Sequence, residues 1–148
     1  MEFDSLDPRL LAGTLHGPDH TADGYFLRAY RRLRGSAARR FHEYGITWSP
    51  GRIVFTVDGR RYGSFERGDQ PRRSPWTYDH PFFLVFTLAI RAGETGGPDA
   101  STRWPATMLV DWVRVRRGRA TYCSTVRTPG LRGSCPRRSP PATSEAGR

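Results

Sequence analysis

The stretch Ile53-Val54-Phe55-Thr56-Val57-Asp58-Gly59 decides how this chain folds. The residues at positions 53, 55 and 57 are apolar and bulky, and such alternation is typical of a β-strand with one buried face. Asp58-Gly59 follows at once, a pair typical of a two-residue turn that requires positive φ. The chain then returns through Tyr62 and Phe65, so this stretch predicts a β-hairpin.

Similar strand signals occur on both sides of this hairpin. A turn at Trp48-Ser49-Pro50-Gly51 precedes it, and further strands are predicted at Leu10 to Leu15, Tyr25 to Tyr30, Phe82 to Ile90 and Met108 to Val115. The run from Phe82 to Ile90 is apolar at both alternating positions, so we expect a central strand that is buried on both faces. No segment shows the 3.6-residue period of a helix. Short strands separated by turn signals predict an all-β sandwich.

The charge is unevenly distributed along the 148 residues. All 24 basic residues are arginine, and the net charge is +10. From Arg117 onward there are seven arginines and one acid, so most of the excess lies there; the arginines at 31–40 fall in an expected solvated loop. The positive charge therefore says little about the folded part. Binding of polyanions through arginine remains one possible function, with no nucleic-acid motif to support it.

The last part of the chain differs in composition from the rest. Residues 118–148 combine four prolines with glycine, serine and arginine, a mixture that buries too little apolar surface to offset the entropy of ordering. We expect a domain at residues 1–117 and a disordered tail at 118–148. Cys123 and Cys135 both fall in this tail, where they could pair with each other but could not crosslink the core.

No stretch approaches the ~18 apolar residues of a membrane-spanning helix, so no membrane partner is expected. The first residues also lack the basic and apolar regions of a secretory signal.

Three separate blocks of sequence carry a resemblance to a known family. They are Asp7-Pro8-Arg9 with Gly13-Thr14-Leu15-His16-Gly17-Pro18, then Phe41-His42-Glu43-Tyr44 with Trp48-Ser49-Pro50 and Val57-Asp58-Gly59, and finally Pro98-Asp99-Ala100-Ser101-Thr102 with Met108-Leu109-Val110-Asp111-Trp112-Val113-Arg114-Val115. In this order they resemble glycoside hydrolase family 16, which includes laminarinases and lichenases. The resemblance implies a concanavalin-like β-jelly-roll, a β-glucan substrate, no required cofactor, and export from the cell as is usual in the family.

The resemblance also implies where the catalytic residues lie. A retaining glycosidase uses two carboxyl groups about 5 Å apart, one as nucleophile and one as general acid/base. The family supplies both from one strand, as Glu-x-Asp-x-x-Glu. In one register Glu2, Asp4 and Asp7 form the whole motif, with Asp7 in place of the last Glu. In the other, Met1-Glu2 matches only the end of the motif, and Glu2 is the acid/base.

The second register is favoured because it continues without a gap into the block that begins at Asp7. It implies that the nucleophile and the strands before it are not among these 148 residues, so the domain would be N-terminally truncated and inactive as this fragment. The function that the resemblance implies is that of a retaining endo-β-glucanase acting on β-1,3 or mixed-linkage glucan, and a non-catalytic carbohydrate-binding β-sandwich is the alternative.

The resemblance places further residues in the substrate groove. His16 matches a family histidine near the glycan, and Trp76 and Trp104 lie in loops where aromatic rings could stack on sugars. Glu94 stands where the family has a tryptophan, and Thr87 where it has an asparagine. These departures weaken the expectation of substrate binding.

Asp111 matches an aspartate that ligates a structural calcium ion in some family members. One carboxylate is not a calcium site, because this ion takes six to eight oxygen ligands. A calcium site therefore needs partners that the sequence does not identify.

Overall fold

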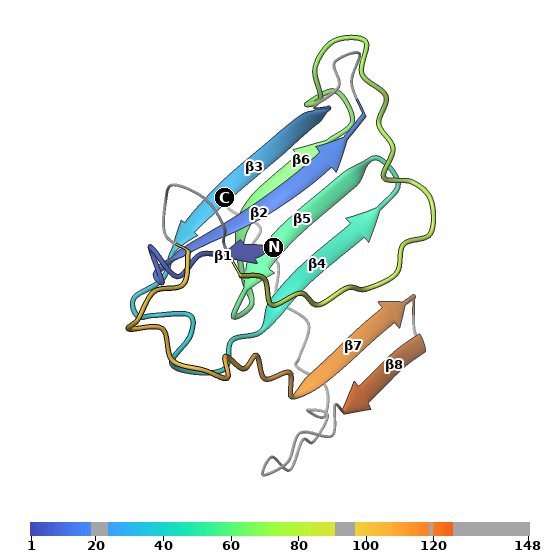
Figure 1. The fold of residues 1–148 in the computed structure, drawn as a ribbon. Coiled ribbons are helices and arrows are strands. Elements are labelled where there is room, and N and C mark those ends of the chain that lie inside the picture. The colour runs from blue at the N-terminus through green and yellow to red at the C-terminus, as the bar shows by residue number, and fades with distance from the viewer. Residues whose placement is uncertain (19–23, 91–96, 119, 126–148) are drawn as a thin grey trace, which may run out of the picture. The chain divides into compact units, whose positions relative to one another are not determined.

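The computed structural model describes residues 1–18, 24–90, 97–118 and 120–125 (Figure 1). The chain divides into two compact units, Met1–Phe83 and Leu84–Arg148, and we describe each by itself. Every strand pairing in the described ranges is antiparallel, and these ranges contain no helix. The predicted all-β fold class is confirmed. No helix among the described residues is long and apolar enough to cross a membrane.

The first sheet of the first unit has the order β1-β2-β3. Strand β1 is Glu2–Phe3, β2 is Leu10–Gly17 and β3 is Tyr25–Arg32. Burial alternates along β2, with Leu11, Gly13 and Leu15 buried and the residues between them more exposed. This period of two follows from the geometry of a strand, and it gives the sheet one buried and one solvent-exposed face.

The second sheet contains the hairpin that the sequence predicts. Strand β4 is Tyr44–Ser49, β5 is Arg52–Val57 and β6 is Arg60–Glu66, in the order β4-β5-β6. Asp58 has φ of 50° and Gly59 has φ of 73°, as the two-residue turn between β5 and β6 requires. The hairpin prediction is therefore confirmed in both its strands and its turn.

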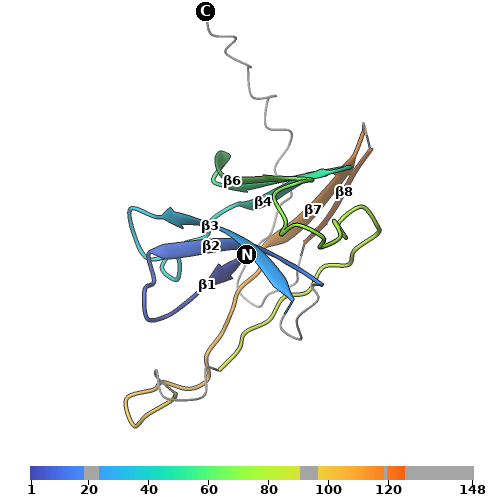
Figure 2. The same cartoon turned by 90° about the horizontal axis from the view of Figure 1, so that it is seen from above.

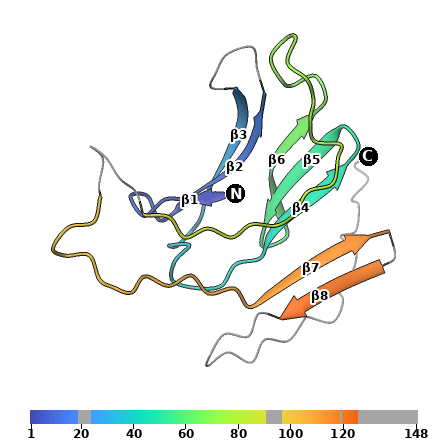
Figure 3. The same ribbon diagram turned by 45° about the vertical axis from the view of Figure 1, so that its right-hand side comes forward.

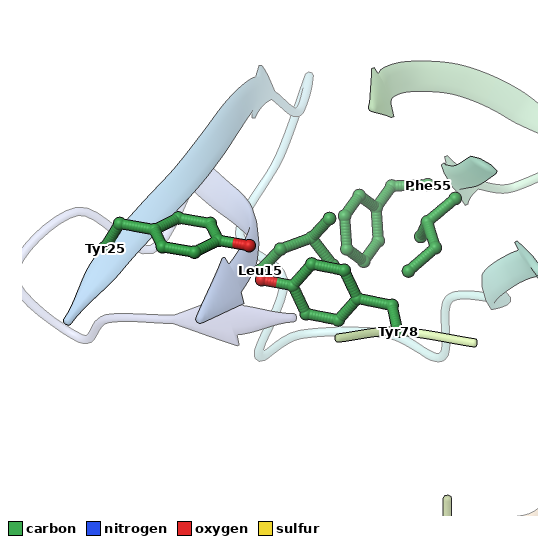
Figure 4. Close-up of a cluster of buried hydrophobic side chains, with 5 residues drawn as sticks. Leu15, Tyr25, Phe55 and Tyr78 are labelled. Carbon is green, nitrogen blue, oxygen red and sulfur yellow. The ribbon is translucent and has the colours of Figure 1, made fainter. Parts of the chain in front are cut away.

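These two sheets form two layers that pack face to face (Figures 2 and 3). One buried cluster joins Leu15 and Tyr25 of the first sheet to Ile53 and Phe55 of the second and to Tyr78, which follows β6 (Figure 4). A second cluster consists of Leu11, Leu33 and Val57. Burying a side chain of this size stabilises a fold by about 1.5–3 kcal/mol, so the two clusters hold the layers together.

In the second unit the described strands are β7, Trp112–Arg117, and β8, Ala120–Thr125, which pair as a hairpin. Residues 120–125 belong to the segment for which the sequence predicts disorder, and this part of the prediction differs from the structure. The unpaired backbone N–H and C=O groups along one edge of β7 need hydrogen-bond partners. Residues 120–125 supply these partners in a six-residue ladder from Trp112↔Thr125 to Arg117↔Ala120. Residues 126–148, including Cys135, lie outside the described residues.

The expected central strand at Phe82 to Ile90 is wrong. These residues form no strand, and their large side chains are exposed, Phe83 by 86%. An apolar run of this kind becomes a buried strand only between two paired neighbours and under two covering layers. In the described part of the chain no strand pairs with it.

Candidate functional site

The exposed face of the β1-β2-β3 sheet gathers polar and aromatic side chains from all three strands. Thr14 lies opposite Arg28, and His16 opposite Phe26, in the β2–β3 register. Glu2 on β1 lies opposite Ala12 of β2. Side chains at alternating positions share one face of a strand, so the buried Leu11 and Leu15 on β2 force Thr14 and His16 outward. We call these residues, Glu2, Thr14, His16, Phe26 and Arg28, the polar face.

Glu2 is the carboxylate of the polar face. Its Oε1 atom lies 3.8 Å from Nε2 of His16, and its Oε2 atom lies 3.8 Å from Nη2 of Arg28. The Glu2 side chain is 56% exposed and that of His16 is 65% exposed, so both are accessible to a ligand. The structure thus brings together the two residues that the sequence proposes as acid/base and as substrate contact.

Arg28 is held in place by its neighbours on the same face. Its Nε donates to Thr14 Oγ1 at 3.1 Å, and its Nη1 donates to the hydroxyl oxygen of Tyr30 at 3.4 Å. Its guanidinium carbon lies 5.0 Å from the centre of the Phe26 ring, a cation–π distance. Sequence reasoning missed Arg28 and Phe26, although their alternation with Leu27 along a strand was visible and could have placed them on one face.

The alternative register would place Asp4 and Asp7 at the site, but the structure uses both carboxylates elsewhere. Asp4 Oδ1 accepts a hydrogen bond from the Leu6 amide at 2.9 Å. Asp7 forms an ion pair with Arg32 at 2.7 Å and accepts from the Arg9 amide. The hydrogen bond from Arg32 holds the pKa of Asp7 below its ordinary value, which disfavours the protonated form that a general acid needs. Among these candidates, Glu2 is the one beside His16.

The other candidate groove residues are Trp76, Trp104 and Glu94. Trp76 packs against the buried cluster in the first unit, its indole nitrogen donates to Asp79 Oδ1 at 3.0 Å, and its ring meets Tyr78 edge-on. It is therefore a half-buried core residue rather than an open platform. Trp104 belongs to the second unit and is 56% exposed. Glu94 lies outside the described residues.

No group of three or more His, Cys, Asp or Glu residues in the described ranges has the arrangement of a metal site. Asp111, the expected calcium ligand, is half-buried immediately before β7. Its role in binding calcium stays a prediction.

The first unit thus presents a carboxylate, an imidazole and an aromatic ring on one exposed sheet face. The family model of "Glycosyl hydrolases family 16" matches residues 9–114. The chain therefore belongs to glycosyl hydrolase family 16, which confirms the expected family and the jelly-roll class of its fold.

Three characterised relatives give the extent of this similarity. A beta-glucanase of Rhodothermus marinus is 32% identical over 136 residues, which is 79% of this chain and 43% of that protein. A glucan endo-1,3-beta-glucosidase A1 of Niallia circulans is 34% identical over 85 residues, or 53% of this chain and 12% of that protein. A keratan-sulfate endo-1,4-beta-galactosidase of Sphingobacterium multivorum is 34% identical over 77 residues, or 51% and 18%.

The chain thus spans less than half the length of each of these relatives. No solved structure matches it.

Proposed function

We propose that the polar face is the substrate face of an endo-β-glucanase of the retaining type, acting on β-1,3 or mixed-linkage glucan, with Glu2 as general acid/base. Membership of the glycosyl hydrolase family and the names of two relatives, a beta-glucanase and a glucan endo-1,3-beta-glucosidase, support the substrate class. The position of the Glu2 carboxylate, 3.8 Å from the imidazole of His16 on an exposed face, is the observation that carries the assignment.

In this proposal each residue of the polar face has a chemical task. Glu2 in its protonated form donates a proton to the glycosidic oxygen of the leaving sugar, and as a carboxylate it later accepts one from water. His16 and Arg28 lie close enough to orient the Glu2 side chain and can donate hydrogen bonds to sugar hydroxyls. The Phe26 ring is 61% exposed and offers an apolar surface to the face of a glucose ring.

Among the described residues, Glu2 supplies the carboxylate beside His16. A retaining reaction needs a second carboxylate about 5 Å from the first. Asp4 and Asp7 are engaged in other contacts. We therefore propose that this 148-residue polypeptide binds β-glucan without hydrolysing it. Binding of this kind is also what the alternative function, a non-catalytic carbohydrate-binding sandwich, would give.

Affinity for laminarihexaose, measured by titration calorimetry, tests the substrate face. Phe26→Ala should weaken binding about three- to tenfold, because it removes a stacking contact of about 1 kcal/mol. Phe41→Ala is the matched control, since Phe41 is an equally exposed phenylalanine (54%) that lies outside the polar face. Absence of binding, or equal loss in both variants, would refute the assignment of this face.

Release of reducing sugar from laminarin and lichenan tests the chemistry. We expect none from the polypeptide alone, and we expect Glu2→Gln to keep the affinity for laminarihexaose within about twofold, since the amide has the size and much of the hydrogen-bonding capacity of the carboxylate. Sustained hydrolysis that Glu2→Gln abolishes would show that a second carboxylate completes the site. Hydrolysis that Glu2→Gln leaves unchanged would contradict the role of Glu2.

A further inference from the structure

A second candidate site lies at the end of the first unit where β3 ends and the turn joins β5 to β6. It is a cavity of about 340 Å³, lined by nine residues from three segments: Arg31, Arg32, Leu33, Arg34, Arg40, His42, Val57, Asp58 and Arg60. Five of these nine are arginines, and we call this feature the arginine pocket. Neither the family resemblance nor the polar face accounts for it.

Local structure brings the arginines together. Arg31 and Arg32 end β3, Arg34 follows directly, Arg40 precedes β4, and Arg60 begins β6 just after the hairpin turn. The floor of the pocket is apolar, because Leu33 and Val57 are only 7% and 3% exposed and pack with Leu11. The backbone amide of Leu33 donates to the Arg9 carbonyl at 2.8 Å, which fixes the chain where it leaves β3. The pocket therefore has a packed base and a basic rim.

Asp58, the acidic residue in the lining of the arginine pocket, is already hydrogen-bonded to other residues. His42, whose side chain is 2% exposed, is hydrogen-bonded through Nδ1 to Asp58 Oδ2 at 2.7 Å. Asp58 also accepts from the Glu43 amide, while Arg40 Nε donates to His42 Nε2 at 3.3 Å. Burial alone would raise the pKa of Asp58, but the hydrogen bonds from His42 and Glu43 outweigh it and the pKa is lowered. Asp58 is thus a structural carboxylate that links β4 to the hairpin turn.

Of the five arginines, two have side-chain partners among the described residues. Arg32 forms its ion pair with Asp7, and Arg40 contacts His42. Arg31, Arg34 and Arg60 make no ion pair or side-chain hydrogen bond with any residue in the described ranges. Cations that converge on one cavity repel one another, and an anion placed among them relieves this repulsion. The planar fork of a guanidinium matches the oxygens of a sulfate or carboxylate with two parallel hydrogen bonds.

We propose that the arginine pocket binds an oxyanion substituent, a sulfate ester or a carboxylate, of an acidic polysaccharide. The polysaccharide part rests on the proposed function, because Phe26, Arg28, Tyr30 and Arg32 alternate along the same exposed side of β3 and connect the polar face to the pocket. At about 3.3 Å per residue, Arg28 and Arg32 are separated by about 13 Å along the strand. A polysaccharide chain that lies along β3 reaches both sites, so a polysaccharide that carries a charged substituent gains a contact in the arginine pocket that a neutral glucan does not make.

Binding of dextran sulfate and of polygalacturonate to the full chain tests this proposal, with inorganic sulfate as competitor. At about 0.15 M salt, charges more than about 8 Å apart are largely screened, so binding reports local contacts. Arg34→Gln with Arg60→Gln should weaken binding of the preferred polymer at least about tenfold, because two charge-assisted contacts are lost. The matched control is Arg61→Gln with Arg72→Gln, which removes the same charge from exposed positions outside the pocket. It should change the affinity by about twofold or less.

Equal losses in the two double variants would overturn the proposal, since binding would then follow net charge alone. Failure of both polymers to bind would also overturn it. Competition by inorganic sulfate at the same concentration of sulfate groups as the polymer would show a site for a free anion and refute the polysaccharide. Loss of laminarihexaose binding in the Phe26 variant tests the proposed function separately. If that test fails while the arginine pair still controls dextran sulfate binding, the pocket stands without the glucanase assignment.

Discussion

Replacing Gly13 by alanine should destabilise the contact between the two sheets. A Cβ atom at this position would lie 2.8 Å from Phe55 Cγ, 2.8 Å from the Tyr62 hydroxyl oxygen and 2.9 Å from Phe55 Cδ2. Carbon atoms in contact ordinarily stay about 3.5–4.0 Å apart, so the rings must move by about 0.7 Å or more. Phe55 is only 1% exposed and cannot turn into solvent. Overpacking of this kind costs about 1–3 kcal/mol.

The lower conformational freedom of alanine in the unfolded chain offsets about 0.4–1 kcal/mol of this cost, so we expect the free energy of unfolding to fall by about 1 kcal/mol, and by about 2.6 kcal/mol at most. Urea unfolding followed by circular dichroism measures it. Gly35→Ala is the control, because a Cβ there meets nothing within 4 Å, and it should be neutral or slightly stabilising. Adding Tyr62→Phe to Gly13→Ala removes one of the three close contacts and should restore part of the loss. Equal stability of the Gly13 and Gly35 variants would refute this account of the sheet packing.

Two further predictions concern single polar groups of the first unit. The buried Tyr62 hydroxyl has no hydrogen-bond partner in the described part of the chain, so Tyr62→Phe should raise the free energy of unfolding at pH 7 by up to about 1 kcal/mol. Burial also raises the pKa of Tyr62 to about 12, so the unfolded chain ionises first, and the stability of the unaltered protein should fall between about pH 10 and 12 more steeply than that of the variant. Identical slopes in alkaline unfolding curves would contradict this. Hydrogen bonds from the Gly51 amide and the Trp76 indole, together with the charge of Arg67, lower the pKa of Asp79. The ionised carboxylate therefore stabilises the fold at any pH above 3.8, the ordinary pKa of aspartate, and this stabilisation is lost as the pH falls through the lowered pKa. Asp79→Asn should therefore destabilise the protein at pH 7, and thermal melts of the two proteins should converge in acid; a constant difference would show that the charge of Asp79 is not the cause.

Local pattern was sufficient to predict much of the first unit. The hairpin of β5 and β6 follows from alternation and from the Asp58-Gly59 turn, both of which act over a few residues. The segments expected around Leu10 and Tyr25 are the strands β2 and β3. The prediction failed where the outcome depends on distant partners. The apolar run from Phe82 to Ile90 has strand composition, but a strand buried on both faces exists only if neighbours pair with it.

The candidate site also combines residues that a local sequence pattern predicts with residues whose positions depend on distant partners. The resemblance placed Glu2 and His16 in one groove, and the alternation of β2 is enough to put His16 on the exposed face. Arg28 and Phe26 were missed because their roles come from the register of β3 against β2, which no local pattern in the sequence specifies. The arginine pocket depends on three segments, distant in the sequence, that meet at one end of the first unit. The sequence predicted a solvated loop at 31–40, whereas Leu33 within it is buried.

The central claim is that a β-glucan binds across Glu2 and His16, and the imidazole proton signals of His16 and His42, two of the four histidines in the chain, test it most directly. In a titration with laminarihexaose followed by nuclear magnetic resonance, the signals of the exposed His16 should shift in proportion to binding. Those of His42, whose side chain is buried against Asp58, should stay unchanged. His16→Asn and, in a separate variant, His42→Asn assign the two sets of signals among the four histidines. If the oligosaccharide binds while the His16 signals do not move, the glucan lies elsewhere and the account is wrong.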